Sequence, residues 1–310
     1  MIKRILVPLD GSQLAESVVP FARYLATGLP AMLTLLHVID PDRLTVPESD
    51  WMSADGIEGR SESGALTYLK RKADQLRSEG CTAEALLRYG KPADVIAGYG
   101  DRSSSTLIAM TAYGRAGLRQ GGVGSVANRV LHSVRCSVLL FHPYRPQQAA
   151  NDAGALSEVI VPLDGSQLGE NAIPIARHLA SGLGSGVTLV QAVLAGSPLY
   201  LGEATYVHLE APLDGPEPAT WSYLHSVARR LERDGVAAHG QLLSGDAGKA
   251  IVDYATRWAG ALIVMATRGS ADSERPRSGS VADYVVRSCP HPVLIVRPSL
   301  EAQHTREAAP

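Results

Sequence analysis

Two short segments of the chain combine residue types that could bind an anionic ligand through the backbone. Asp10-Gly11-Ser12 directly follows an apolar run, and Gly124-Ser125 opens a segment with helical periodicity. Glycine lets a backbone approach a phosphate closely and adopt positive φ. A helix N-terminus adds unpaired N–H groups and the positive end of a dipole. Together these segments could hold a phosphate without a basic side chain.

Both segments occur twice. The octet Val7 to Leu14 recurs unchanged at Val161 to Leu168, 154 residues later. The pattern that runs from Met110 through Gly114, nine further residues and Gly124-Ser125-Val126-Ala127 recurs from Met265, 155 residues later. Two matched blocks with nearly the same offset indicate that a whole domain was duplicated.

Each segment also has a purely structural interpretation. An isolated Asp-Gly-Ser is equally well explained as a helix N-cap with a tight turn, and the glycine segment as a surface loop with an ordinary cap. Retention of both in both halves favours a binding function. A recent duplication would explain the identical octets as well.

The elements that position these segments follow from hydrophobic periodicity. In the first half, short apolar runs predict strands, and amphipathic segments between them predict helices. The predicted strands are 5–9, 32–39, 83–88, 106–110 and 138–141, and the predicted helices are 13–26, 65–78, one opening near Pro92, and 125–131. Continuous apolar strands alternating with helices indicate a parallel sheet covered on both faces, with ligands bound beyond the carboxyl ends of its strands.

Composition narrows the function classes. The 310 residues are 45% hydrophobic and 19% charged, which excludes intrinsic disorder, and the net charge of −2 gives no basic field for a nucleic-acid polymer or an anionic membrane. Three cysteines without a C-x-x-C pair indicate a reducing compartment. Neither a signal peptide nor an apolar run of membrane-spanning length is visible, so we expect a cytoplasmic protein.

The combined motifs resemble the ATP-binding branch of the universal stress protein family, whose loop after strand four reads Gly-x-x-Gly, nine residues, then Gly-Ser or Gly-Thr. The resemblance covers both halves almost end to end. It implies an α/β protein of two tandem Rossmann-like domains, each a doubly wound, five-stranded parallel sheet of order 3-2-1-4-5. We place domain 1 at 1–145, a linker at 146–155, domain 2 at 156–299 and a tail at 300–310. The first loop glycine is replaced by Thr111 and Ala266.

The resemblance also implies the ligand contacts. Pro8 and Asp10 would lie against the adenosine portion, Val38 would offer backbone groups to adenine, and Met110 would lie under the loop. The phosphates would be bound by Gly114, Gly124, Ser125 and Val126. The corresponding residues of the second half are Pro162, Asp164, Ala192, Met265, Gly269, Gly279, Ser280 and Val281.

The two loops differ in charge. The first carries Arg115 and Arg119, whereas the second carries Asp272 and Glu274 beside its arginines, and Pro276 lacks a donor N–H. Carboxylates near a triphosphate are repulsive unless a metal or an arginine intervenes. We therefore expect two ATP sites, the second weaker, with ATP accompanied by magnesium. The residues that would hold a metal are not identified, because the nine histidines show no ligand spacing.

The function that the resemblance implies is that of an ATP-binding regulator in the stress response, with no catalytic residues. One alternative is an ATPase or phosphotransferase that uses the same loops; it would need a general base, and the recurrent carboxylates are Asp10 and Asp164. Another is an interaction protein with vestigial sites. The resemblance further implies pairing through the last predicted strand, 138–141 or 293–296, either between the two halves of one chain, between two chains, or both. We expect a homodimer. Protein partners are not identified.

Overall fold

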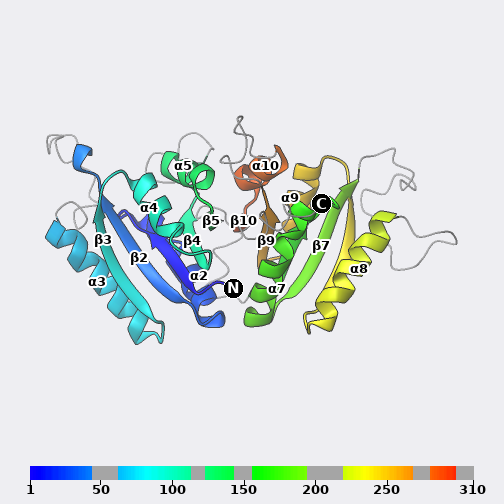
Figure 1. Ribbon diagram of the computed structural model, residues 1–310, viewed down its shortest axis with the longest axis horizontal. Coiled ribbons are helices and arrows are strands. Elements are labelled where there is room, and N and C mark those ends of the chain that lie inside the picture. The colour runs from blue at the N-terminus through cyan, green and yellow to red at the C-terminus, as the bar shows by residue number, and fades with distance from the viewer. Residues whose placement is uncertain (44–61, 113–122, 143–155, 194–218, 268–279, 298–310) are drawn as a thin grey trace, which may run out of the picture. The chain divides into compact units, whose positions relative to one another are not determined.

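In the computed structural model, the described residues are 1–43, 62–112, 123–142, 156–193, 219–267 and 280–297. They form two compact units (Figure 1), which we call unit 1 (described residues Met1 to His142) and unit 2 (Leu156 to Arg297). The predicted linker 146–155 and tail 300–310 lie outside the described residues. The prediction of two tandem α/β domains is confirmed.

Unit 1 has a parallel sheet of order β3-β2-β1-β4-β5. Its strands are β1 (Arg4–Pro8), β2 (Met32–Ile39), β3 (Ala83–Tyr89), β4 (Thr106–Thr111) and β5 (Ser137–Phe141). Its helices are α1 (Gln13–Glu16), α2 (Val19–Gly28), α3 (Glu62–Ser78), α4 (Pro92–Gly100) and α5 (Ser125–Ser133), with a 3-10 turn, η1, at Pro41–Arg43. The predicted order 3-2-1-4-5 is confirmed.

Unit 2 repeats this topology as β8-β7-β6-β9-β10. Its strands are β6 (Glu158–Pro162), β7 (Gly186–Val193), β8 (Ala238–Ser244), β9 (Ala261–Ala266) and β10 (Val293–Val296). Its helices are α6 (Gln167–Glu170), α7 (Ala172–Leu183), α8 (Ala219–Arg233), α9 (Ala247–Ala255) and α10 (Ser280–Ser288).

The core of each unit lies on the central strands. In β1, Ile5, Leu6 and Val7 are at most 1% exposed, although successive side chains of a strand point to opposite faces of the sheet. The sheet of unit 1 is therefore covered on both sides, as Figure 1 shows, with α3 on one face and α4 on the other. This burial explains why the strands are continuous apolar runs rather than alternating ones.

The prediction of one continuous helix over 13–26 is wrong. The segment forms α1 and α2, separated at Ser17 and Val18. Pro20 causes the break, because its ring would clash with the carbonyl of the residue four positions earlier, Glu16, and α1 ends there. Pro174 stands in the same relation to Glu170, where α6 ends.

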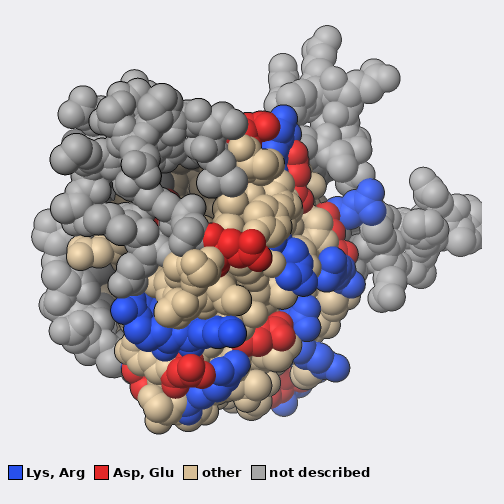
Figure 2. All heavy atoms as spheres, turned by 90° about the vertical axis from the view of Figure 1, so that its left-hand side faces the viewer, with Lys and Arg blue, Asp and Glu red and all other residues tan. Residues whose placement is uncertain are grey.

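Polar contacts tie α1 to α3 in unit 1. The Tyr68 hydroxyl donates to Glu16 Oε1 (2.8 Å), and Lys72 Nζ pairs with Glu16 Oε2 (2.5 Å). Burial, reinforced by Glu16, raises the pKa of Tyr68, so the phenol remains a donor. Lys and Arg side chains alternate with Asp and Glu side chains on the side of unit 1 that carries α3 (Figure 2), which is the pattern expected of paired charges.

Unit 2 makes the same connection between α6 and α8, with an arginine in place of the lysine. Glu170 accepts from the Tyr223 hydroxyl (3.2 Å) and from Arg230 Nη2 (3.1 Å). Burial and Glu170 raise the pKa of Tyr223 to about 12. Arg230 lies one turn further along its helix than Lys72 does in the duplicated register, so the contact is kept although the position of the basic residue has moved.

The hydrogen bonds of the buried threonines differ more between the units than the contacts between these helices do. In unit 1 the Thr34 hydroxyl donates to Glu84 (2.7 Å). In unit 2 the corresponding hydroxyl, of Thr188, donates to Glu158 Oε1 (2.6 Å) and lies 3.0 Å from His239 Nε2. Glu158 is 5% exposed. Its burial raises the pKa of its carboxyl above the ordinary 4.5, against the opposing effects of Thr188 and His239.

A raised carboxyl pKa gives a defined pH dependence. The stability that Glu158 contributes is fully present below pH 4.5. It is lost as the pH rises through the raised pKa that the carboxyl has in the folded protein. We expect Glu158→Gln to remove this loss, so the variant gains in free energy of unfolding relative to the parent as the pH rises from 4 to 7. Urea unfolding from pH 4 to 7 measures this difference in the free energy of unfolding, and Glu84→Gln in unit 1 is the control. Parallel pH profiles of the parent and Glu158→Gln would contradict the assignment.

Gly186 makes room for this carboxylate. A Cβ at Gly186 would lie 2.7 Å from Glu158 Oε2, whereas a Cβ at Gly98 in α4 would meet nothing within 4 Å. We expect Gly186→Ala to lower the free energy of unfolding by about 1–3 kcal/mol through overpacking. The control Gly98→Ala should raise it by about 0.5–1 kcal/mol through helix propensity. Equal effects in thermal or urea unfolding would refute the steric explanation.

Candidate functional site

The Asp10 turn closes the end of β1 and begins α1. Asp10 Oδ1 accepts hydrogen bonds from the Ser12 N–H (3.0 Å) and hydroxyl (2.5 Å), and Ser12 Oγ accepts from the Ala15 N–H (3.2 Å). Gly11 has a φ of 78°, a conformation that favours glycine. Pro8, the last residue of β1, is half-buried.

Unit 2 repeats this turn almost bond for bond. Asp164 Oδ1 accepts from the Ser166 N–H (2.9 Å) and hydroxyl (2.6 Å), and Ser166 Oγ accepts from the Gly169 N–H (3.1 Å). Pro162 is half-buried before it. The capping interpretation of Asp-Gly-Ser is therefore correct for both copies. Both aspartates are nevertheless exposed, so a ligand can reach them.

The end of β2 presents backbone groups beside the Asp10 turn. Along a strand, the N–H and C=O groups of successive residues point alternately to the two neighbouring strands. The Leu36 carbonyl accepts from the Leu9 N–H on the β1 side (2.8 Å), and the Ile39 carbonyl accepts from the Gly90 N–H on the β3 side (3.0 Å). Val38 therefore directs its N–H and C=O to the β1 side, beyond the Leu9–Leu36 bond.

Ala192 has the same geometry in unit 2. The Val190 carbonyl accepts from the Leu163 N–H (2.8 Å), and the Val193 carbonyl accepts from the Gly245 N–H (2.9 Å). The polar backbone groups of Ala192 thus point toward the β6 side, beside the Asp164 turn. This position would suit the Watson–Crick edge of a base.

The N-terminus of α5 lies at the carboxyl end of β4. The Gly124 N–H donates to the Ala112 carbonyl (2.7 Å), and the Ala112 N–H donates to the Phe141 carbonyl (2.8 Å). Gly124 is the N-cap without a side-chain cap bond, and the first turn of α5 contains no acidic residue. The N–H groups of Ser125 and Val126 therefore begin an uncapped helix at this edge. Met110 is buried in β4 beneath it.

In unit 2, α10 begins at Ser280, Val281 is half-buried and Met265 is buried in β9. The first turn of α10 contains Asp283, whose Oδ2 accepts from Arg287 Nε (2.9 Å). In the duplicated register its counterpart is the uncharged Asn128. This difference was not predicted, although it is visible when the two halves of the sequence are compared position by position.

Three predicted contacts lie outside the described residues: Gly114, Gly269 and Gly279. The loop residues compared above for their charge, 115–119 and 272–276, lie outside them too. The other predicted residues of unit 1 gather at one edge of the sheet, because β2, β1 and β4 are neighbours and all end there. Those of unit 2 gather in the same way at the ends of β7, β6 and β9. Each set suits an elongated ligand with a polar base at one end and an anion at the other.

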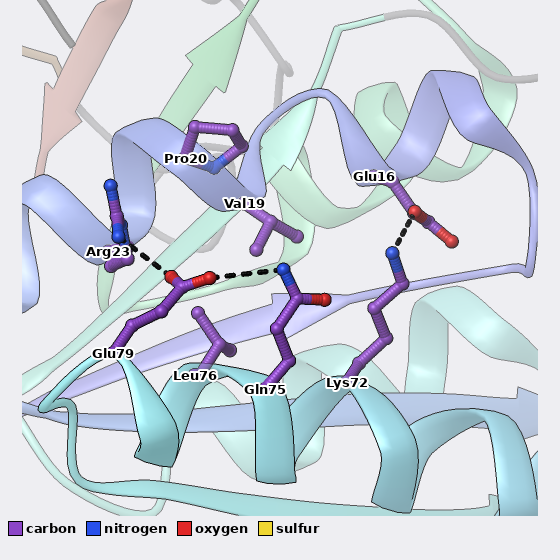
Figure 3. Close-up of a pocket in the computed structure, with 8 residues that line it drawn as sticks. All are labelled: Glu16, Val19, Pro20, Arg23, Lys72, Gln75, Leu76 and Glu79. Carbon is purple, nitrogen blue, oxygen red and sulfur yellow. Dashed lines mark hydrogen bonds and ion pairs between the residues drawn. The ribbon is translucent and has the colours of Figure 1, made fainter.

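A groove elsewhere in unit 1 is another candidate for a ligand site. It is a groove of about 270 Å³ between α2 and α3. Figure 3 shows its polar side chains directed at one another: Arg23 pairs with Glu79, Glu79 accepts from Gln75, and Lys72 pairs with Glu16. Val19, Pro20 and Leu76 complete its lining. Since the polar groups already pair across it, this groove is better explained as helix packing than as a ligand site.

Neither a metal site nor a membrane-spanning helix is found among the described residues. Across the parts of the chain that the structure describes, no three His, Cys, Asp or Glu side chains gather where they could bind a metal ion. None of the described helices combines the length and the apolar character needed to span a bilayer.

Comparison with known proteins identifies the family. The model of the universal stress protein family matches residues 1–142 and again 156–297. The universal stress protein YxiE of Bacillus subtilis (strain 168) is 28% identical over 149 residues, which cover 45% of this chain and 99% of that protein.

Solved structures match across both units. A universal stress protein from Archaeoglobus fulgidus aligns with a TM-score of 0.69 at 19% identity, over 96% of this chain and 98% of that one. A functionally unknown protein from Pseudomonas aeruginosa PAO1 aligns with a TM-score of 0.62 at 16% identity, over 99% and 96%. The two successive matches to the family model, which together cover most of the sequence, show that the chain is a tandem member of the universal stress protein family.

Proposed function

We propose that this protein binds ATP at the carboxyl edge of each sheet and acts as a nucleotide-linked regulator in the stress response. The observation that carries the proposal is the meeting of three features at one edge of unit 1: the exposed Asp10 carboxylate, the outward backbone groups of Val38, and the uncapped N-terminus of α5. The regulatory role rests on family membership.

Each feature would meet a different part of the nucleotide. Val38 would pair with the polar edge of adenine, the Asp10 carboxylate would accept from a ribose hydroxyl, and the first-turn N–H groups of α5 would bind the phosphates. Magnesium keeps several waters and is bound chiefly by the phosphates of a nucleotide. The site therefore supplies recognition through main-chain atoms, with one carboxylate for the sugar.

The contacts of Asp10 and Asp164 favour binding over hydrolysis. Each carboxylate accepts two hydrogen bonds at Oδ1 within its own turn, which commits that oxygen to the start of a helix rather than to the role of a general base. Mass spectrometry of ligand released from the purified protein, followed by a product assay, tests the proposal. Intact ATP supports it; steady production of ADP or AMP supports the enzyme alternative; and a protein that ignores added nucleotide supports vestigial sites.

Two further expectations have different grounds: the homodimer rests on the family resemblance, and the cytoplasmic location rests on the cysteine pattern and the N-terminal sequence. We propose a homodimer and a cytoplasmic location, and light scattering of the purified protein checks the first.

The role of the α5 amides can be isolated by one substitution. Ser125→Pro removes the first N–H of the helix, at a position where proline is well tolerated, and Gly124 (φ −59°, ψ 152°) already has the conformation that a following proline requires. We expect ATP binding to weaken about tenfold or more, because a hydrogen bond to a charged group contributes about 1.5–3 kcal/mol. Calorimetric titration measures this. Ser125→Ala, which keeps the N–H, is the control, and equal affinities for the two variants would exclude an amide site.

The difference between the units can be tested by exchange. Asp283 places a negative charge in the first turn of α10, where Asn128 of α5 is neutral. We expect Asp283→Asn to strengthen ATP binding to unit 2 and Asn128→Asp to weaken it in unit 1, each about two- to fivefold, from about 0.3–1 kcal/mol for a charge at a helix end. Two-site calorimetry at low salt reports both. Changes in the same direction would show that the charge does not act on the ligand.

A further inference from the structure

Within the described residues, the sheet of each unit ends in a strand that pairs on one side only. These strands are β3, which is bonded to β2 in unit 1, and β8, which is bonded to β7 in unit 2 (Figure 1). The other side of an edge strand presents backbone N–H and C=O groups to which the edge of another sheet can bond, and proteins protect such edges with charged or covering side chains. The contacts along β3 and β8 therefore decide whether these edges can associate.

The outward backbone groups of β3 follow from its register. The Leu33 N–H donates to the Thr82 carbonyl (2.9 Å), and the Gly90 N–H donates to the Ile39 carbonyl (3.0 Å). Thr82 and Gly90 thus direct their backbone groups to β2. Since the backbone groups of successive residues alternate in direction, those of the odd-numbered residues between them point away from the sheet. These residues are Ala83, Ala85, Leu87 and Tyr89.

Two of these outward carbonyls accept hydrogen bonds from arginine side chains. Arg77 Nε donates to the Ala83 carbonyl (2.8 Å), and Arg88 Nη1 donates to the Leu87 carbonyl (2.7 Å). Both arginines are exposed. Each guanidinium occupies the direction from which another strand would donate, and a second strand laid over it would remove water from its charge, which costs free energy.

The two arginines are held from opposite faces of the sheet. Arg77 belongs to α3, and its Nη1 pairs with Asp74 Oδ1 one turn earlier in that helix (2.6 Å). Arg88 donates from Nε to the hydroxyl of Tyr99 in α4 and lies over that ring, 5.1 Å from its centroid. Since α3 and α4 cover different faces of the sheet, the β3 edge is covered from both sides by positioned positive charges.

Unit 2 covers the corresponding carbonyl with a different side chain. The Val187 N–H donates to the Ala237 carbonyl (2.9 Å), so the even-numbered residues of β8 direct their backbone groups outward. One of these is Leu242, whose carbonyl accepts from Gln241 Nε2 (2.8 Å). Leu242 corresponds to Leu87 in the duplicated register. The hydrogen bond comes from the residue before this carbonyl rather than from the residue after it, so the contact is kept although its donor has changed.

We propose that Arg77 and Arg88 prevent the β3 edge from pairing with the β3 edge of a second copy of the chain. Without them, two such edges could pair antiparallel about a twofold axis, because an isologous contact places the same outward groups opposite each other. The edge of β3 is thus a latent self-association surface that two arginine side chains keep unpaired. This role does not require a bound nucleotide.

The test removes both guanidinium groups and keeps long side chains. We expect the double variant Arg77→Met, Arg88→Met to reach an apparent mass at least about twofold above that of the parent at high protein concentration, because pairing through one edge joins two copies. Analytical ultracentrifugation over a concentration series measures this mass. The control is Lys70→Met, Lys91→Met, which removes two exposed charges from the same unit and should behave as the parent does.

A proline shows whether the association uses the edge. Ala85→Pro removes one outward N–H that β2 does not use, and proline is tolerated on the outward side of an edge strand. We expect it to return the double variant to the mass of the parent. A double variant with the mass of the parent, or association that persists with Ala85→Pro, overturns the proposal. Circular dichroism reports the fold of each variant, and if the double variant is unfolded, Arg77→Met alone is tested in the same way, because it leaves the contact with Tyr99 in place.

Discussion

The candidate site depends on the point at which β1 leaves the sheet. The Leu9 N–H makes its bond to the Leu36 carbonyl, and the chain then turns through Asp10 and Gly11 while β2 continues to Ile39. Because of this difference in length, the polar groups of Val38 face the space that β1 has vacated. Unit 2 repeats the arrangement, with the Leu163–Val190 bond as the corresponding point.

Under the proposed function, a polyanion would bind at this edge without a basic surface. Backbone N–H groups and a helix dipole act over short distances and need no net charge, so the chain's charge of −2 is compatible with a phosphorylated ligand. The duplicated units share that backbone geometry but differ in the side chains around it. A carboxylate enters the first turn of α10.

Away from the site, the same duplication kept contacts while changing their chemistry. The α1–α3 connection is rebuilt in unit 2 with an arginine one turn away from the lysine of unit 1. The buried threonine of the second strand bonds a glutamate on β3 in unit 1, whereas in unit 2 it bonds a glutamate on β6 and contacts a histidine on β8. Topology is thus preserved by the apolar strands, while the partners of the buried threonines differ between the units.

The duplication and the parallel sheets could be predicted from the residues alone, because apolar runs and repeated motifs are local patterns. The strand order was predicted from the resemblance to the universal stress protein family. The sequence also located Asp10, Val38 and Ser125 near strand or helix ends. The tertiary structure was needed to show which way the Val38 backbone points, and that the buried Thr34 and Thr188 hydroxyls bond glutamates on different strands. Those facts depend on hydrogen-bond register and on packing between segments distant in the sequence, which no local pattern encodes.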